Sequence, residues 1–241
     1  MKVVLEYDGS DFVGWQQQAN GRTVEAELKR ALRELTGTEH KVYAAGRTDA
    51  GAHAEGQVVS FETDGRITPL RLVAALNARL PRDVSVLTAE VAPAGFHARY
   101  SARWRRYRYR YVDRRARPAL ERGRCWHVVG PLDVAAMSVA AQALVGKHDW
   151  TSYCSASEPP AGRVREMRST KVARQGDFVE LELVAEGFLR GLARSIAGAL
   201  AEVGRGRKPP EWVGEVLRAR DRRLAARTAP AGGLTLVEVI Y

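Results

Sequence analysis

The sequence predicts an α/β protein (α+β type) made of two pseudo-symmetric split β-α-β halves. Two observations predict this fold: the order β-α-β-β-α-β occurs twice along the chain, and 241 residues suit one large domain or two closely joined halves. We expect the halves, residues 1–102 and 103–241, to join into a continuous, mainly antiparallel sheet with helices packed on it. A central cleft where the halves meet is the expected binding place.

The first half begins with strand-like residues 2–7, which end at the turn Asp8-Gly9. Residues 24–36 carry apolar side chains at helical spacing, behind Thr23 as N-cap and before Gly37 as the stop. The remaining expected elements are strands at 40–45 and 57–63 around a glycine-bearing loop at 46–56, a helix from Thr68-Pro69 to about residue 80, and a strand at 84–91.

The second half repeats this order, although the two halves share no visible sequence identity. Residues 188–203 predict a helix with Phe188, Leu192 and Ile196 on one face. The other expected elements are a strand at 103–113, a helix at 132–145 that stops at Gly146, strands at 167–174 and 178–185 around the turn 175–177, a short helix near 210–219 and a strand at 234–240.

The charge balance favours a polyanionic partner. Lys and Arg number 38 against 28 Asp and Glu, so the formal net charge is +10. Arginine supplies almost all of the excess, and its planar fork suits phosphate contacts better than the lysine ammonium does. A generally basic protein with solvated arginines is the alternative that charge alone leaves open.

Several classes of protein are disfavoured by what the sequence lacks. Cys125 and Cys154 are the only cysteines, which is no disulfide framework and favours a reducing cytoplasm. Glu6 and Asp8 stand where a signal peptide needs apolar residues, and no apolar run approaches the roughly 20 residues of a membrane span. We expect neither a metal site nor a nucleotide cofactor, because zinc-ligand spacing, a P-loop and a strand-to-helix GxGxxG are missing.

Residues 45–53, AGRTDAGAH, are the sharpest functional signal in the chain. They follow a predicted strand, and two glycines let the backbone turn tightly and approach a ligand. Asp49 is therefore expected on a positioned loop, with Arg47 and His53 on either side of it. The alternative is an Asx-turn, in which Asp49 only binds its own loop amides.

Arginines and tyrosines alternate along the predicted strand 103–113. On a strand Arg106, Arg108 and Arg110 share one face, which makes a cationic surface suited to phosphates. A solvated strand face is the alternative. Tyr107, Tyr109 and Tyr111 share the opposite face, and for Tyr109 and Tyr111 we favour a place in the core.

The segment AGRTDAGAHAEGQV (45–58) resembles the signature loop of the tRNA pseudouridine synthase A family. The resemblance covers nearly the whole chain through EYDGSDFVGWQ (6–16), FHARYSA (96–102), RRYRYRY (105–111), HDWTSY (148–153), FLRGLARSIAGAL (188–200) and AGGLTLVEV (231–239). It implies that Asp49 is the catalytic carboxylate, that Tyr107 contacts the substrate, and that Arg194 is the arginine of the late helix motif. Two departures stand out: Ala193-Arg194-Ser195 replaces the family's Val-Arg-Asn, and residues 154–164 align poorly.

The resemblance also implies a substrate and a chemistry. It implies tRNA as the substrate, at positions 38 to 40 of the anticodon stem-loop, and a cytoplasmic homodimer without cofactor. A base in a stem must be flipped out, and Tyr107 offers it an aromatic face. A guanidinium such as that of Arg194 would keep Asp49 ionised. Arg47 is a candidate wedge for the vacated gap, and Arg99, His53 and Arg106 are further candidates for substrate contact.

The rival interpretation is a non-catalytic basic RNA-binding protein or RNA chaperone. Asp49 argues against it, because pure binding has no use for a carboxylate aimed at a polyanion. A metal-dependent nuclease is a weaker rival, since Glu55 is the nearest other carboxylate and the two make a thin metal site.

Overall fold

The computed structural model describes residues 1–63 and 67–241, and these form two compact units. The first unit contains Met1–Arg103 and Leu236–Tyr241, and the second contains Trp104–Thr235. The units differ from the predicted halves at two places, because Arg103 and residues 236–241 count with the first unit. Over the described residues there are five α-helices and ten strands in a mainly antiparallel open sheet. The predicted α/β class is therefore confirmed, while the predicted central cleft stays a prediction.

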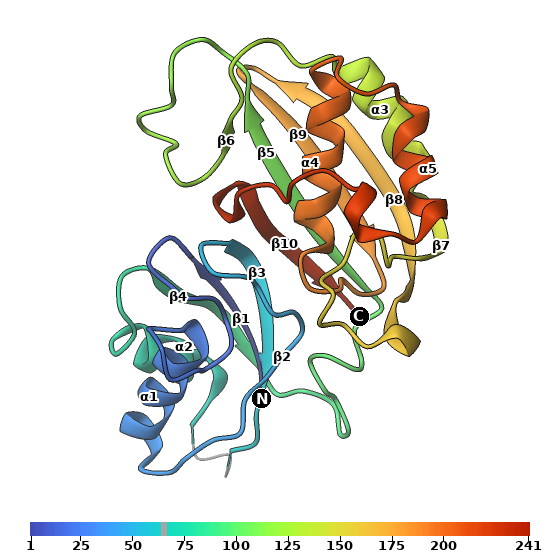
Figure 1. The fold of residues 1–241 in the computed structure, drawn as a ribbon. Coiled ribbons are helices and arrows are strands. Elements are labelled where there is room, and N and C mark those ends of the chain that lie inside the picture. The colour runs from blue at the N-terminus through green and yellow to red at the C-terminus, as the bar shows by residue number, and fades with distance from the viewer. Residues whose placement is uncertain (64–66) are drawn as a thin grey trace. The chain divides into compact units, whose positions relative to one another are not determined.

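The first unit follows the predicted order β-α-β-β-α-β (Figure 1). Strands β4 and β3 flank β1 in antiparallel register, β2 pairs with β3, and β10 is the next strand beyond β3. Helix α2 packs on β4 and α1 contacts α2. The elements are β1 (Lys2–Tyr7), α1 (Val24–Thr36), β2 (Tyr43–Ala44), β3 (His53–Ser60), α2 (Pro69–Asn77), β4 (Val84–Glu90) and β10 (Leu234–Ile240).

Helix α1 shows how closely local sequence can specify an element. The Thr23 hydroxyl accepts a hydrogen bond from the Ala26 amide at the N-terminus, and Gly37 ends the helix with φ of 74°. Its apolar stripe is fully buried at Val24, Leu28 and Leu32. The predicted bounds of 24–36 are confirmed.

Strand β3 begins earlier than predicted. The sequence placed a loop over 46–56, but the strand starts at His53, and Ala54 pairs with Tyr7 of β1. Gly56 was interpreted as a loop glycine, yet a Cβ there would lie 2.4 Å from the Val237 carbonyl oxygen of β10. The glycine is needed because a neighbouring strand approaches closely, and not because the chain turns there.

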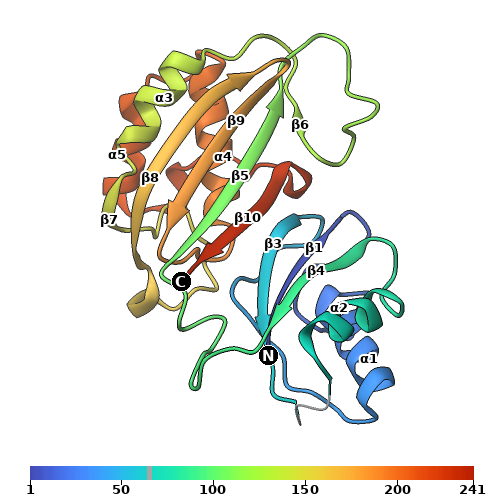
Figure 2. The same cartoon turned by 180° about the vertical axis from the view of Figure 1, so that it is seen from behind.

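The second unit is a layer of helices on one side of an antiparallel sheet. The strand order is β5-β9-β8-β7, with β6 parallel to β5. The three helices cover one face of this sheet, whose other face is seen in Figure 2. The elements are β5 (Trp104–Val112), β6 (Trp126–His127), α3 (Val134–Gln142), β7 (Gly146–Asp149), β8 (Val164–Gln175), β9 (Phe178–Ala185), α4 (Leu192–Gly204) and α5 (Glu211–Ala219).

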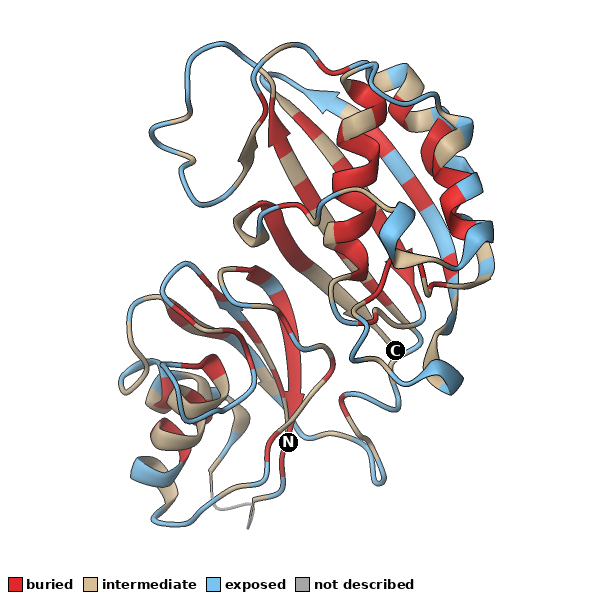
Figure 3. Cartoon of the chain, viewed as in Figure 1, coloured by how far each residue is buried: buried red, intermediate tan, exposed pale blue. Residues whose placement is uncertain are grey.

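Helix α4 forms the centre of this unit and is buried along most of its length (Figure 3). The prediction that it begins at Phe188 was wrong, because Gly191 has φ of 76° and the helix starts at Leu192. The left-handed backbone at Gly191 interrupts any helix at that point. Phe188 therefore lies in the preceding loop. Strands β6 and β7 were not predicted, since each is too short to show a pattern.

Candidate active site

The loop that carries Asp49 connects β2 to β3 in the first unit. Its first residue, Ala45, donates its amide to the Val58 carbonyl at 2.8 Å, which continues the pairing of β2 with β3. At its far end the Ala52 amide donates to the Asp49 carbonyl at 3.1 Å. Gly51 lies inside this turn with φ of 80°. The turn fixes the backbone of Asp49, and the residue itself is half-buried.

A buried glutamine of β3 supports the loop from below. The side chain of Gln57 is fully buried, and its Nε2 donates to the Gly46 carbonyl at 2.6 Å. Its Oε1 accepts the Gly46 amide at 3.3 Å. One side chain thus pairs with both the amide and the carbonyl of a half-buried loop residue, groups that need partners where water has little access. The available signal for this supporting residue was a polar side chain directly before the apolar pair Val58 and Val59, and it was missed in the sequence.

A second support comes from β1 through Tyr7 and Thr48. Their hydroxyl groups are 2.8 Å apart, and both residues are buried. Burial raises the pKa of the Tyr7 phenol to about 12, an effect that its hydrogen bonds with Thr48 and Gln57 oppose. Tyr7 is therefore neutral near pH 7, and its hydroxyl forms a hydrogen bond with Thr48, the residue before Asp49.

A third support is the segment that precedes α1. The Trp15 amide donates to the Thr48 carbonyl at 3.1 Å, and the Gly51 amide donates to the Phe12 carbonyl at 3.2 Å. Gly14 lies between these contacts with φ of 109°, and a Cβ there would lie 2.9 Å from the Thr48 carbonyl oxygen. Residues 12–15 therefore bind the loop through backbone hydrogen bonds on both sides of Asp49.

His53 lies at the start of β3, and its side chain is almost fully buried. Its Nδ1 accepts the Gly9 amide at 3.0 Å and is 3.2 Å from an Asp8 carboxylate oxygen. The contact orients the turn after β1. A role for His53 in substrate contact stays a prediction, as it does for Arg47, whose side chain is exposed on the loop.

Tyr107 of β5 lies in the second unit, on the side of its strand that faces the core. It is 5% exposed, and its ring meets that of Phe188 edge-on at 4.6 Å between centroids. Tyr109 and Tyr111 are fully buried and donate to the carbonyls of Pro230 and Ala197. Their hydroxyls are thus engaged in the core, as expected of them.

The arginine face of β5 meets carboxylates of β9. Arg108 and Arg110 lie 3.9 and 3.4 Å from Glu180, and Arg106 lies 3.9 Å from Glu182. Arg110 also approaches Glu121 at 2.9 Å. The sequence could not show which strand would pair with β5, so the cationic face was predicted without its acidic partners. A role for Arg106 in binding phosphate stays a prediction, now with a competing carboxylate in view.

Arg194 lies in the first turn of α4 and is half-buried. Its Nε donates to the Ala229 carbonyl at 2.9 Å, while the Ala229 amide donates to the Arg194 carbonyl at 3.1 Å. This pair of bonds fixes the stem of the side chain against residues 227–229. Burial raises the pKa of Tyr109, and the nearby Arg194 charge opposes that rise.

The poorly aligned residues 154–164 have a definite structure. The Arg163 guanidinium donates to the Glu158 carbonyl at 2.7 Å. The Glu158 carboxylate in turn accepts the Arg190 amide at 2.9 Å, and the Ser155 amide donates to the Arg190 carbonyl at 2.9 Å. The segment therefore packs on the loop that leads into α4.

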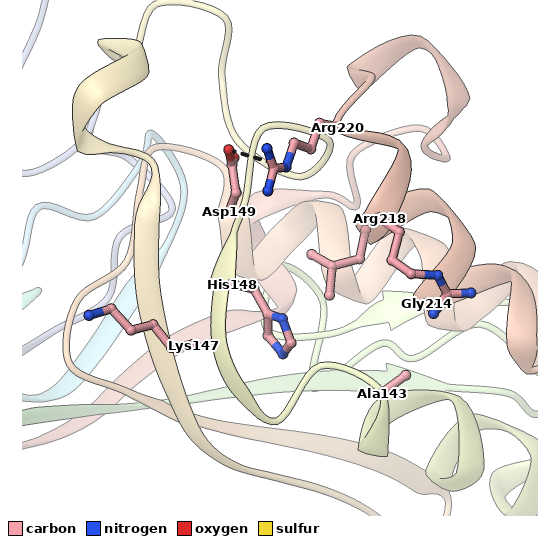
Figure 4. Close-up of a pocket in the computed structure, with 8 residues that line it drawn as sticks. Ala143, Lys147, His148, Asp149, Gly214, Arg218 and Arg220 are labelled. Atoms are coloured by element: carbon pink, nitrogen blue, oxygen red, sulfur yellow. Dashed lines mark ion pairs between the residues drawn. The ribbon is translucent and has the colours of Figure 1, made fainter.

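A pocket of about 360 Å³ lies between β7 and α5 of the second unit (Figure 4). Asp149 and Arg220 at its edge form an ion pair at 3.5 Å. Burial raises the pKa of the Asp149 carboxyl, but the Thr151 hydrogen bonds and the Arg220 charge outweigh it and leave the pKa below its usual range. The lining contains none of the predicted site residues and consists of Ala143, Lys147, His148, Asp149, Gly214, Leu217, Arg218 and Arg220.

Together these features define a basic α/β protein in which one carboxylate is mounted on a loop held from three directions. No helix of the described residues is both long and apolar enough to cross a membrane. An enzyme that acts on a polyanion is the class that fits a positioned carboxylate in a chain of net charge +10.

Comparison with known proteins identifies the family. The sequence profile described as tRNA pseudouridine synthase matches residues 3–101 and 140–241. The chain is 46% identical to tRNA pseudouridine synthase A of Moorella thermoacetica, over 100% of this chain and 99% of that protein. The tRNA pseudouridine synthase A of Myxococcus xanthus is 44% identical, over 100% of this chain and 91% of that protein. The tRNA pseudouridine synthase A of Caulobacter vibrioides is also 44% identical, over 100% of this chain and 98% of that protein. The chain belongs to the tRNA pseudouridine synthase family and is an enzyme, an isomerase.

Proposed function

We propose that this enzyme converts uridine to pseudouridine at positions 38 to 40 of the tRNA anticodon stem-loop, with Asp49 as the catalytic carboxylate. The observation that supports it best is the mounting of Asp49. Its loop is held by Gln57 of β3, by Tyr7 of β1 and by the backbone of residues 12–15. A reacting group must be kept within a fraction of an ångström of its productive position, and such support provides this.

The reaction is an isomerisation in which atoms balance without a group donor. The bond between ribose C1′ and uracil N1 breaks, the base turns, and a bond forms between C1′ and C5. The proton lost from C5 is matched by one gained at N1. One ionised carboxylate can begin this sequence by attack on the ribose, by removal of a ribose proton or by addition to the base, and Asp49 is proposed for that step.

The remaining residues are proposed as contacts to the RNA. Tyr107 offers an aromatic ring, held by Phe188, on which a flipped uracil can stack. Arg194 is proposed to act on the reacting nucleotide through a guanidinium whose Nε is already anchored at Ala229. The proposed binding residues outside these two are Arg47, His53, Arg99 and Arg106.

A cytoplasmic homodimer is part of the proposal, because the resemblance implies both. Sedimentation of the purified protein at micromolar concentration tests the oligomeric state directly. A monomer that retains full activity would remove the dimer from the account and leave the proposed chemistry standing.

Mapping pseudouridine in tRNA tests the proposed function. An unmodified tRNA transcript with uridines at 38, 39 and 40 is incubated with the purified protein, beside a matched transcript with cytidines there. We expect pseudouridine at those positions in the first transcript and none in the second. Pseudouridine at other positions only would refute the proposed site, and its absence from both transcripts would refute the proposed activity.

A further inference from the structure

Three aromatic rings of the first unit form a continuous stack that no proposed site includes. Tyr43 of β2 lies 4.4 Å from His97 between ring centroids, and His97 lies 4.4 Å from Tyr100. The planes are inclined by 45° and 37°. Tyr100 at the outer end is 77% exposed, although large aromatic rings usually bury most of their surface.

The turn that carries Tyr100 is closed by hydrogen bonds of His97 and Ser101. The Nδ1 of His97 accepts the amides of Arg99 and Tyr100 at 3.1 and 3.3 Å, which orients the ring inside its own turn. The Ser101 amide donates to the His97 carbonyl at 2.9 Å, and the His97 amide donates to the Ser101 hydroxyl at 3.0 Å. Four hydrogen bonds therefore hold the backbone of the turn from which the Tyr100 side chain extends.

The turn is anchored to the part of the sheet that carries the Asp49 loop. The Ala98 amide donates to the Ser60 hydroxyl of β3 at 3.0 Å, and Ala98 is fully buried. Ala98 shares a core cluster with Ala45 and Val58. Ala45 is the first residue of the Asp49 loop, so the turn that carries the ring stack and the proposed catalytic loop pack against the same core cluster.

Two cations flank the stack. The Lys41 ammonium lies 5.3 Å from the centre of the Tyr43 ring, and the Arg99 guanidinium lies 5.7 Å from the centre of the Tyr100 ring. Both side chains are exposed. An exposed aromatic face beside cations matches an unpaired nucleotide, whose base stacks on the ring while its phosphates meet the charges.

We propose that Tyr43, His97 and Tyr100 form a stacking platform for an unpaired base of the bound RNA, with the outer face of Tyr100 as the stacking surface. Lys41 and Arg99 take the adjoining phosphates. This inference rests on the proposed function for the identity of the RNA, and it adds a contact to a base other than the one that reacts. The platform thus holds single-stranded nucleotides beside the proposed catalytic loop.

Binding of two RNA probes to Tyr100 variants tests the platform. Fluorescence anisotropy at fixed salt compares an RNA hairpin that has an unpaired loop with a fully paired duplex of the same stem. We expect Tyr100→Leu to weaken hairpin binding roughly 5- to 150-fold, which corresponds to the ~1–3 kcal/mol of one base stacked on an aromatic ring. Tyr100→Phe should bind the hairpin like the wild type, and duplex binding should be unchanged in both variants.

Leu70→Ala is the matched control, because Leu70 is an apolar side chain of α2 in the same unit and is 83% exposed. Hairpin binding by Tyr100→Leu that equals the wild type, or an equal loss for hairpin and duplex, would overturn the platform. A change in sedimentation of Tyr100→Leu together with the loss of binding would instead assign the stack to contact with a second copy. The proposed function fails separately, if the wild-type protein forms no pseudouridine at all.

Discussion

Replacing Gln57 by leucine removes the support of the Asp49 loop with little change in side-chain volume. Leucine fills similar space in the core but has neither donor nor acceptor. The Gly46 amide and carbonyl then lose the partners that Gln57 places at 3.3 and 2.6 Å. Gln57 is fully buried, so water reaches the vacated position only if the loop moves.

The magnitude follows from the two groups left without partners. Each buried polar group that loses its hydrogen bond costs about 1–3 kcal/mol. Gly46 is itself half-buried, so hydration relieves part of that cost once the loop shifts. We therefore expect Gln57→Leu to lower the free energy of unfolding by about 2–4 kcal/mol, a large share of the 5–15 kcal/mol typical of native proteins.

Urea unfolding and single-turnover kinetics measure the two consequences. The midpoint of unfolding should fall with an unchanged slope, and the rate of pseudouridine formation should fall more than tRNA affinity does, because the loop positions the reacting carboxylate. Gln142→Leu is the control, since Gln142 is an exposed residue of α3 whose side chain makes only a long hydrogen bond of 3.5 Å to the Thr170 carbonyl, so this change should leave both quantities nearly unaltered. A Gln57→Leu protein with wild-type stability and rate would show that the glutamine supports nothing.

Three further predictions concern Tyr107, Arg194 and Tyr7. If the Tyr107 hydroxyl assists proton transfer, Tyr107→Phe should lower the single-turnover rate roughly 10²–10⁴-fold and leave tRNA binding intact. Tyr107→Leu should lower the tRNA affinity as well, because it also removes the aromatic ring. Near-normal rates for both variants would return Tyr107 to a purely structural role. Arg194→Ala should be nearly inactive and Arg194→Lys partly active, because lysine supplies charge without the planar fork; normal turnover by the alanine variant would contradict this. The raised pKa of Tyr7 means that the fold favours the neutral phenol, so its contribution to stability is present below pH 10 and is lost as pH rises through about 12. As the pH rises between these values, the free energy of unfolding measured with urea should fall by about 2–3 kcal/mol more for the wild type than for Tyr7→Phe. The same pH dependence in both proteins would refute this prediction.

The parts of the fold that sequence predicts well are those decided by local chemistry. Helix α1 has its N-cap, apolar stripe and terminal glycine within fifteen residues, and its bounds were predicted correctly. Strands β1, β4 and β9 likewise lie where they were predicted, at 2–7, 84–91 and 178–185. The position of Asp49 on a loop after a strand was also predictable, because two glycines and a preceding strand mark it.

The features that sequence did not reveal depend on which segments meet in space. Gly56 is required by the approach of Val237, and Gly191 interrupts a helical pattern that the apolar residues alone would extend back to Phe188. The carboxylates of Glu180 and Glu182 lie beside the arginines only because β9 pairs with β5 in that register. Gln57 went unnoticed for the same reason, since its partner is eleven residues away along the chain.

The most direct test of the central claim is single-turnover pseudouridine formation by Asp49→Asn at saturating enzyme. The variant keeps the size of the side chain and removes the charge, so it should form no pseudouridine while binding tRNA within about tenfold of the wild type. Glu55→Gln is the matched control, because Glu55 is an exposed carboxylate six residues away on β3, and it should turn over normally. Pseudouridine formation by Asp49→Asn at a rate near that of the wild type would contradict the assignment of Asp49 as the catalytic carboxylate.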